Sequence, residues 1–253
     1  MINIALVGSN GKMGQVISRL ADQSDNSSIV FGIDINTEKK CDYNVYSSFA
    51  DASEKCDVII DFSHPSSLDA TLEFAKSNKI PAVIATTGLS AEQVESIKKA
   101  SEVTPIFFSA NMSLGVNLLI QLAKKATALL EDSFDIEIVE KHHNLKIDAP
   151  SGTALAIADA INDTSAHSNE YVYDRHSTRK KRSKREIGIH SVRGGTIVGE
   201  HNVIFAGTDE IIEIKHTATS KEIFATGAFK AAHFLINKHP GLYSMDELIA
   251  EIC

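Results

Sequence analysis

The first 111 residues alternate short apolar runs with helical segments, and this alternation restricts the possible folds more than any other feature of the chain. Between these runs, apolar residues recur at helical spacing. The second and third expected helices each begin with a serine, which is an expected N-cap. The pattern predicts parallel strands buried on both faces, joined by right-handed crossovers, and hence a doubly wound α/β fold. The expected strands are 2–8, 28–35, 57–63, 81–88 and 105–111, and the expected helices are 12–24, 66–77 and 90–101.

The pattern changes after residue 111, where longer segments alternate apolar with polar residues. This alternation predicts a second, α+β domain with a mostly antiparallel sheet. We therefore expect a first domain over 1–111, a second domain over 112–219, and a C-terminal segment, 220–253, that packs back on the first. The expected helices are 113–130, 151–161 and 220–237, and the expected strands lie in 134–143, 186–207 and 210–219.

Composition excludes several classes of protein. The chain has 253 residues, a hydrophobic share of 43% and a formal net charge of −8, which argues against binding nucleic acid or an anionic membrane. Its three cysteines form no disulfide or metal-ligand pattern, so we expect no metal site. With no signal peptide and no run of ~20 apolar residues, a cytoplasmic location is expected.

A glycine triplet lies between the first expected strand and the first expected helix. Gly8, Gly11 and Gly14 have the spacing that lets a backbone turn tightly, approach a pyrophosphate closely and present the N–H groups of a helix start. Its position immediately after a strand and before a helix, followed by an acidic residue at the end of the next strand, predicts dinucleotide binding.

The acidic residue is Asp34, twenty residues beyond Gly14. Its carboxylate can accept hydrogen bonds from a ribose 2′-OH, although a turn-closing acid is an equal alternative for this residue taken alone. A carboxylate repels a 2′-phosphate and no arginine follows it, but Lys39 and Lys40 could reach that position. We expect NADH to serve at least as well as NADPH.

Polar residues end three of the expected strands and could line the nicotinamide half of the groove, because ligands of open parallel sheets bind outside the carboxyl ends of the strands. Strand ends are also polar simply because turns are polar. The three ends are Asp61-Phe62-Ser63, Thr86-Thr87-Gly88 and Ser109-Ala110-Asn111.

A basic segment, 174–186, carries seven arginines and lysines and no apolar residue. Such a run is typical of a solvated, mobile loop. Steering of an anionic cofactor or substrate is the alternative.

Two histidines and a lysine precede a helix start in "EKHHNLKIDAPSGTA". An alternating strand places His142 and His143 on opposite faces, so they are expected to differ in role. Imidazole suits proton transfer near neutral pH, and Lys146 adds a positive charge. Gly152 and Thr153, at the start of the helix, complete a plausible carboxylate-binding site, and Ser151 or Thr153 can be an N-cap as well.

At these residues the chain resembles the 4-hydroxy-tetrahydrodipicolinate reductase (dihydrodipicolinate reductase) family of lysine biosynthesis. The resemblance rests on "VGSNGKMG", "DFSHP", "ATTG", "SANMSLGVN", "EKHHNLKIDAPSGTA" and "RGGTIVGEH", which occur in the family's order. It implies a Rossmann domain that binds NADH or NADPH, a second domain that binds a cyclic dicarboxylate, and a homotetramer built through the second domain's sheet.

The resemblance also implies roles for individual residues. His142 matches the proton donor and acceptor, Lys146 the second proton donor, and His143, Gly152 and Thr153 the substrate-binding positions. Ala85 replaces a glycine found in many members, and Lys221 an arginine found in some. The positions that match cofactor binding are Gly8, Ser9, Asn10, Gly11, Lys12, Met13, Asp34, Ala85, Thr86, Thr87, Ser109, Ala110, Asn111 and Met112.

Two other functions remain open from the residues. One is another NAD-dependent dehydrogenase of a small imino or amino acid. The other is a dinucleotide-sensing regulator whose basic segment binds nucleic acid, against which the acidic net charge and the pairing of His142 with Lys146 both speak.

Overall fold

A computed structural model of the chain describes residues 1–252, which form two compact units. The first unit contains Met1–Leu114 together with the segment from Glu222 on, and the second contains Gly115–Lys221. Among residues 1–252, no helix is both long enough and apolar enough to cross a membrane.

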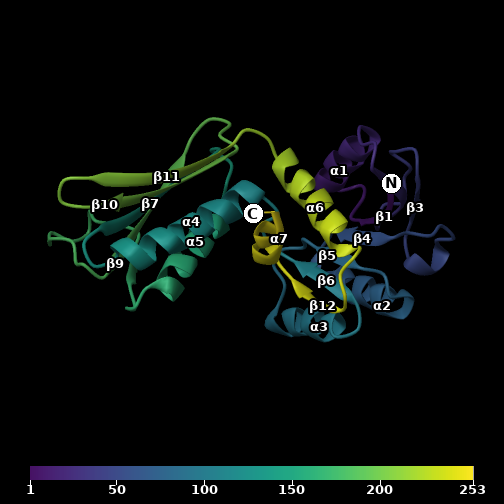
Figure 1. Cartoon of the computed structure of the whole chain (residues 1–253). Helices are drawn as coiled ribbons and strands as arrows, with labels where there is room; N and C mark the ends of the chain where they lie inside the picture. The colour runs from purple at the N-terminus through teal and green to yellow at the C-terminus, as the bar shows by residue number, and fades with distance from the viewer. Residues whose placement is uncertain (253) are drawn as a thin grey trace. The chain divides into compact units, whose positions relative to one another are not determined.

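The first unit is a seven-stranded parallel sheet with helices on both faces (Figure 1). The strand order is β12-β6-β5-β4-β1-β2-β3, and every neighbouring pair is parallel, which confirms the doubly wound α/β prediction. The strands are β1 (Ile2–Val7), β2 (Ser27–Ile33), β3 (Asn44–Tyr46), β4 (Val58–Asp61), β5 (Ala82–Ile84), β6 (Pro105–Phe108) and β12 (Gly241–Tyr243).

Two hydrophobic clusters hold the helices against this sheet. One face packs against α1 (Lys12–Asp22), α6 (Glu222–Leu235) and α7 (Met245–Ile252), and the other against α2 (Leu68–Asn78) and α3 (Ala91–Ser101). Because small side chains line α6, among them Ala228 and Ala231, which are fully buried, the helix can approach the sheet closely. Residues from the C-terminal part of the chain thus belong to the core of the first unit.

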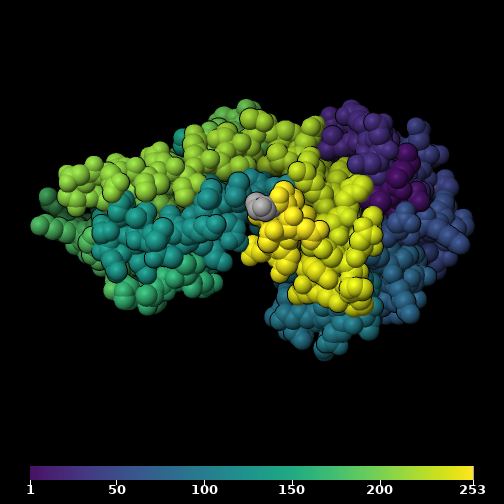
Figure 2. All heavy atoms as spheres, viewed as in Figure 1, coloured from purple at the N-terminus to yellow at the C-terminus, as the bar shows by residue number. Residues whose placement is uncertain are grey.

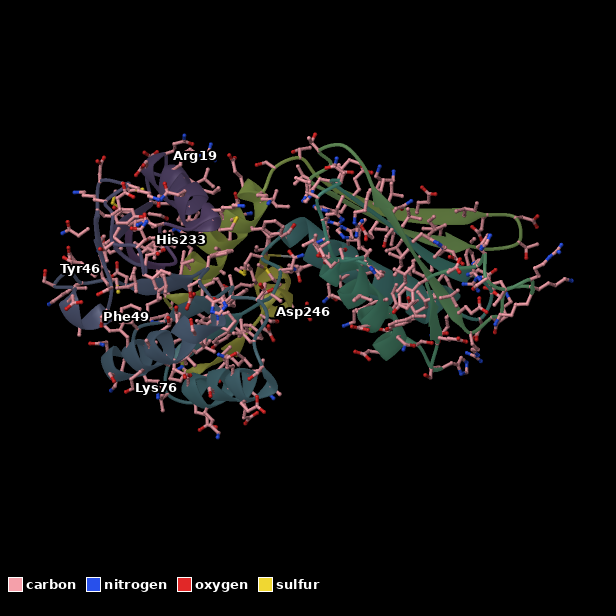
Figure 3. All side chains as sticks on the ribbon, turned by 180° about the vertical axis from the view of Figure 1, so that it is seen from behind. Arg19, Tyr46, Phe49, Lys76, His233 and Asp246 are labelled. Atoms are coloured by element: carbon pink, nitrogen blue, oxygen red, sulfur yellow. The ribbon has the colours of Figure 1, made fainter. Side chains whose placement is uncertain are left out.

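The helices α6 and α1 lie side by side. Arg19 on α1 and Glu222 on α6 form an ion pair at 2.6 Å, although more than 200 residues separate them in the sequence. Arg19 and His233 mark α1 and α6 in Figure 3, and the space-filling view shows yellow-green residues of the C-terminal part of the chain against purple N-terminal ones (Figure 2). The His233 ring also hydrogen-bonds the Ser27 hydroxyl, at 2.9 Å, and so links α6 to β2.

The helix caps agree with the prediction at one position and differ at another. Ser90 and Gln93 form a reciprocal capping box at the start of α3. Ser66, by contrast, is not an N-cap, because a short 3₁₀-helix (Pro65–Ser67) precedes α2 and is capped by His64. His64 supplies the acceptor that the serine was expected to supply, and Pro65 fixes the backbone for that earlier start.

The second unit is a five-stranded sheet with helices on one face. Its order is β11-β10-β7-β9-β8; β10 is antiparallel to β7 and β11, whereas β9 is parallel to β7 and β8. The sheet is therefore mixed: the prediction of antiparallel pairing holds for β10 and its two neighbours but not for β9. The elements are α4 (Leu114–Leu130), β7 (Asp135–His142), α5 (Gly152–Thr164), β8 (Glu170–Val172), β9 (Glu186–Arg193), β10 (Gly199–Ala206) and β11 (Ile211–Ala218).

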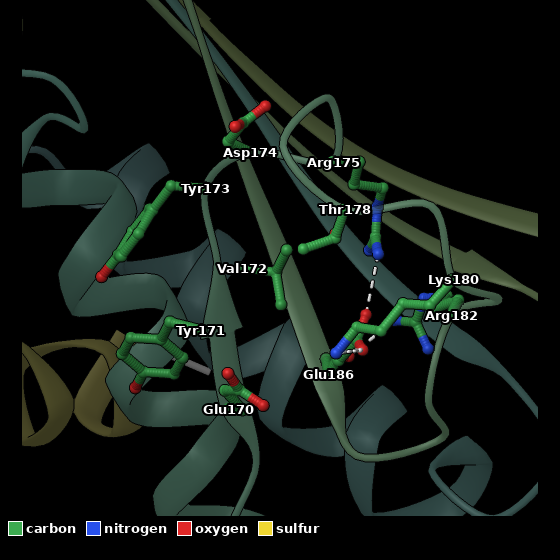
Figure 4. A pocket seen from close by; sticks show the side chains of 10 residues that line it. All are labelled: Glu170, Tyr171, Val172, Tyr173, Asp174, Arg175, Thr178, Lys180, Arg182 and Glu186. Carbon is green, nitrogen blue, oxygen red and sulfur yellow. Dashed lines mark hydrogen bonds and ion pairs between the residues drawn. The ribbon is translucent and has the colours of Figure 1, made fainter.

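The basic segment 174–186 is bound to its own sheet and is not simply a solvated loop. Arg182 is largely buried and pairs with Asp135 and Glu137, each at 3.0 Å. Arg175 pairs with Glu137 and Glu186 at 2.7 Å, and Arg175, Arg182 and Glu186 are among the residues that line a cavity of about 270 Å³ (Figure 4). Most of the segment is exposed, as predicted for a solvated loop, but its two ordered arginines were not expected, because a count along the sequence misses the acids that β7 and β9 place beneath the segment.

Candidate active site

The glycine turn after β1 is sterically required. Gly8 has a φ of 80°, and a Cβ placed on it would lie 2.8 Å from the carbonyl oxygen of Phe62. A Cβ on Gly14 would lie 2.2 Å from the carbonyl oxygen of Gly8. Gly11 is the N-cap of α1 and provides no side-chain cap, so the first N–H groups of the helix are available to an anion.

Asp34 lies beside this turn, just beyond the end of β2. Its carboxylate accepts hydrogen bonds from the backbone N–H groups of Asn10, at 2.9 Å, and Asn36, at 3.0 Å. The Asn10 side chain donates to the carbonyl oxygens of Asn36 and Glu38. The loops after β1 and β2 are thus held together, and each carboxylate oxygen of Asp34 keeps a lone pair for a further donor.

A cavity of about 460 Å³ adjoins the turn and Asp34 within the first unit. Both apolar and polar side chains line it, a mixture that suits an adenosine group. Its lining residues are Val7, Gly8, Gly11, Ile33, Asp34, Ile35, Ser47, Phe62, Ser63, His64, Ser66 and Ser67. The turn, the free helix start, the carboxylate and the cavity together fit a dinucleotide.

The polar strand ends have a structural role that their polarity alone did not reveal. Asp61 is fully buried and accepts hydrogen bonds from the hydroxyls of Ser63, Thr71 and Thr86. These bonds tie the ends of β4 and β5 to α2. Asp61 and the Thr86 hydroxyl therefore brace the strand ends.

The residues predicted to bind the cofactor differ in how accessible they are. Ser9 is fully buried and its hydroxyl has no hydrogen-bond partner within residues 1–252, so only its backbone is suited to contact a ligand. Gly11, Lys12, Thr87 and Ala110 are exposed; Gly8, Asn10, Met13, Asp34, Ser109 and Asn111 are half-buried; Ser9, Ala85, Thr86 and Met112 are buried.

In the second unit, His142 is the last residue of β7 and lies on the buried face of that strand. Its Nδ1 atom is 2.6 Å from a carboxylate oxygen of Glu140, which is fully buried. Gly199 on β10 faces the opposite side of the ring, where a Cβ would lie 3.1 Å from Nε2. A glycine at this position leaves room for a ligand atom to approach that nitrogen.

Glu140 is held by several donors. Arg193 on β9 donates to both carboxylate oxygens, at 2.7 and 2.8 Å, and the backbone N–H of Ser151 donates at 3.1 Å. Burial raises the pKa of Glu140, but the hydrogen bonds from Arg193 and His142 outweigh that effect and lower the pKa to about 2. Glu140 is therefore ionised at neutral pH.

His201 on β10 packs edge-on against His142, with ring centroids 5.3 Å apart. Its Nε2 is 3.1 Å from the hydroxyl of Ser151, which also caps α5 by accepting from the N–H of Ala154. Burial, together with the neighbouring His142, lowers the pKa of His201 to about 4. His201 is thus neutral at physiological pH.

Lys146 and the start of α5 hold a carboxylate that belongs to the protein itself. The Lys146 ammonium is 2.8 Å from the carboxylate of Asp148. This ion pair is the main cause of the lowered pKa of Asp148, and the nearby Gly152 N–H acts in the same direction. A Cβ on Gly152 would meet no atom within 4 Å, so the helix start is open. The donors present here are therefore able to bind a carboxylate.

His143 follows directly after β7 and is half-buried, and Thr153 in the first turn of α5 is also half-buried. The Nδ1 atom of His143 is buried and has no hydrogen-bond partner within the described chain. A ligand that offers a complementary atom to His143 would remove this unsatisfied group.

Sequence reasoning missed Glu140, Arg193 and His201 as members of this site. Glu140 could have been found, because a residue two before His142 in an alternating strand points to the same face. Arg193 and His201 come from strands whose order the sequence does not reveal. Among residues 1–252, no cluster of three or more histidines, cysteines or acids could hold a metal ion.

The first unit is a parallel, doubly wound sheet with a glycine turn. The second contains a buried histidine–carboxylate pair and a helix start with donors for a carboxylate. Together these features define a two-domain nicotinamide-dependent oxidoreductase. The chain belongs, more specifically, to the dihydrodipicolinate reductase family. The family models described as "Dihydrodipicolinate reductase, N-terminus" and "Dihydrodipicolinate reductase, C-terminus" match residues 2–112 and 115–249.

Named relatives match over nearly the full length. The 4-hydroxy-tetrahydrodipicolinate reductase of Caldanaerobacter subterraneus subsp. tengcongensis is 54% identical over 98% of both chains. That of Clostridium tetani is 49% identical over 97% of this chain and 96% of its own. Family membership implies a nicotinamide cofactor for the first unit.

Solved structures support the fold. A dipicolinate-bound dihydrodipicolinate reductase from Paenisporosarcina sp. TG-14 superposes with a TM-score of 0.82 at 24% identity, over 96% of this chain and 97% of that one. A diaminopimelate dehydrogenase from Corynebacterium glutamicum has the same general fold, with a TM-score of 0.58 at 14% identity, and covers 100% of this chain and 99% of its own.

Proposed function

We propose that the chain reduces 4-hydroxy-tetrahydrodipicolinate, or the dihydrodipicolinate formed from it, to tetrahydrodipicolinate in the diaminopimelate route to lysine. One observation carries the proposal beyond family membership: Lys146 already holds a carboxylate, that of Asp148, beside the open start of α5 at Gly152. A substrate carboxylate that replaces Asp148 would meet the Lys146 ammonium and the N–H groups of that helix start. The carboxylate of dipicolinate bound by a relative supports this chemistry.

His142 is the proposed proton donor. Its Nδ1 is occupied by Glu140, so Nε2 beside Gly199 is the nitrogen that exchanges a proton with the substrate. Lys146 neutralises a carboxylate and favours proton delivery as a second donor. His143, Gly152 and Thr153 orient the ring by binding its polar groups. The nicotinamide, when bound, supplies the hydride.

The glycine turn and α1 start are proposed to bind the pyrophosphate, and Asp34 the ribose of the adenosine half. We propose that NADH serves at least as well as NADPH, because the Asp34 carboxylate repels a 2′-phosphate. The nearest basic candidates, Lys39 and Lys40, are exposed on the loop that follows. The other predicted contacts are Ala85, Thr86 and Thr87 after β5, and Ser109, Ala110, Asn111 and Met112 after β6.

We further propose a cytoplasmic homotetramer assembled through the second unit. Family resemblance suggests this assembly, and the edge strand β11 supports it, because Ile211 is 65% exposed and Ile212 39% exposed in the monomer. In this scheme 1–111 is the dinucleotide-binding domain and 112–219 the substrate-binding and tetramerisation domain. Light scattering after size-exclusion chromatography measures the assembly directly.

The test of function is oxidation of NADH and NADPH with enzymatically generated substrate, with tetrahydrodipicolinate identified by mass spectrometry. We expect turnover with both cofactors and no turnover when the substrate-generating enzyme is left out. Absence of product, or turnover only with a different imino or amino acid, would overturn the proposal.

A further inference from the structure

The carboxylate beneath His142 has so far served only to identify Nε2 as the nitrogen that faces the substrate. Glu140 and His142 lie on the same face of β7, and their side chains approach to 2.6 Å. Glu140 is fully buried, whereas His142 keeps a small exposed edge. The carboxylate can therefore contact the imidazole but not the substrate.

Isolated buried carboxylates take up a proton to avoid the cost of desolvation, and Glu140 has partners that prevent this. Arg193 binds both oxygens in a bidentate pair, and the Ser151 N–H at the start of α5 provides a third donor. Arg193 also donates to the Asp148 carbonyl oxygen, at 2.6 Å. The negative charge of Glu140 is thus fixed and aimed at Nδ1.

A second carboxylate–histidine pair on the same strand provides a comparison. Glu137 lies on the opposite face of β7 and is 2.7 Å from Nε2 of His190 on β9. That pair is open to solvent, with 21% of the Glu137 side chain and 38% of the His190 side chain exposed, and Glu137 is shared with two arginines. It has similar contacts without the burial, and so serves as a matched control.

We propose that Glu140 is a positioning residue for His142: it accepts the Nδ1–H, fixes the ring so that Nε2 faces the substrate, and stabilises the imidazolium that gives up the proton. The proposal rests on the proposed role of His142 as the proton donor. Arg193 and the Ser151 N–H act through Glu140 by keeping it charged and in place.

The charged and titratable groups around His142 set the direction of the pH effect. Glu140 is the negative one in contact with the ring, and Lys146 and Arg193 are positive. His201 is adjacent and neutral, with His216 beyond it on β11. Asp148 is negative but is paired with Lys146. Replacing Glu140 with a neutral residue removes the one carboxylate in contact with the ring and leaves Arg193 positive, so the protonated ring becomes less stable.

The first test needs no variant. In protein labelled with ¹⁵N-histidine, the nitrogen shifts of neutral His142 identify its tautomer. The proposal requires the Nδ1–H tautomer, with Nε2 unprotonated. A neutral His142 protonated at Nε2 would overturn the proposal, whatever the enzymatic activity proves to be.

The second test compares Glu140→Gln with Glu137→Gln. For Glu140→Gln we expect kcat to fall about 100-fold and the alkaline limb of the pH profile of kcat to move down by about one pH unit. Glu140→Asp, which keeps the charge, should retain the wild-type limb. Glu137→Gln should leave the profile where it is, with assembly checked by light scattering.

A purely structural Glu140 would give a different result. Glu140→Gln would then lower thermal stability while leaving the pH profile and the tautomer of His142 unchanged, and that outcome would reject the proposal. If Glu140→Gln fails to fold, the wild-type tautomer and the Glu140→Asp profile still decide. Failure of the proposed function is separate, since it appears as absent turnover in the wild-type enzyme.

Discussion

The Lys146 ammonium lies 2.8 Å from the Asp148 carboxylate, a side chain that is 56% exposed. In the proposed function, Asp148 thus occupies the place that a substrate carboxylate would take. Because exposed ion pairs are worth at most about 1 kcal/mol, a substrate can displace Asp148 at low cost.

Substitutions of this pair should act in opposite directions. For Asp148→Asn we expect the KM of the dicarboxylate to fall by up to about fivefold, because the competing charge is gone. For Lys146→Ala we expect KM to rise at least about tenfold and kcat to fall. Steady-state kinetics measures both, and an unchanged KM in Lys146→Ala would contradict the carboxylate role.

The Gly152→Ala variant distinguishes an effect on substrate binding from an effect on stability. A Cβ at this position meets no protein atom within 4 Å, so the free energy of unfolding should change by no more than about 0.5 kcal/mol. The methyl group would project from the helix start where the substrate carboxylate approaches. We expect the KM of the dicarboxylate to rise about tenfold and the KM of NADH to stay constant. Equal changes in both constants would argue against a local contact.

Asp34→Asn tests cofactor preference, because the amide keeps the size and an acceptor atom but removes the charge. We expect the ratio of kcat/KM for NADPH to that for NADH to rise about tenfold, the scale of one charge repulsion near a protein surface. The KM of the dicarboxylate should not change. A wild-type ratio already far above one would contradict the role given to Asp34.

Stability should depend on pH through His201. Since burial depresses the pKa of His201 from 6.5 to about 4, the unfolded chain binds the proton first as pH falls. The free energy of unfolding should therefore drop by up to about 3 kcal/mol between about pH 6.5 and pH 4. Glu140 adds its own loss only below its ordinary pKa of 4.5. Urea unfolding measures the slope.

The control is a histidine outside the buried network. His201→Gln should reduce the slope above about pH 4.5 and leave the contributions of His216 and His233, whose pKa values burial also lowers. His239→Gln, at an exposed position, should leave the dependence as in the wild type. The same slope in both variants would mean that another group carries the dependence.

The sequence predicted the first unit well because buried parallel strands and amphipathic helices have distinct periods. The strands β3, β8 and β12 were not predicted, because three residues are too few to establish a period. The short helix α7 was not predicted either. The parallel pairing of β7 with β9 was also missed, because strand order is set by tertiary packing.

The site was predicted only in part, again because tertiary packing decides which distant residues meet. His142, His143, Lys146 and Gly152 are close in sequence, so a motif could suggest that they act together. The residues that hold Glu140 and pack against His142 are Arg193 on β9 and His201 on β10, which lie more than 50 residues further along the chain. Likewise, the neutralisation of Arg182 by Asp135 requires that two distant segments meet.

His142→Gln tests the central claim most directly, since the variant keeps the size and polarity of the side chain but cannot donate a proton from an imidazolium. The measurement is kcat for NADH oxidation with enzymatically generated substrate, beside the Kd of NADH by fluorescence. We predict that kcat falls by at least about 100-fold while the Kd stays at its wild-type value. Near-normal turnover would contradict the assignment of His142 as the proton donor.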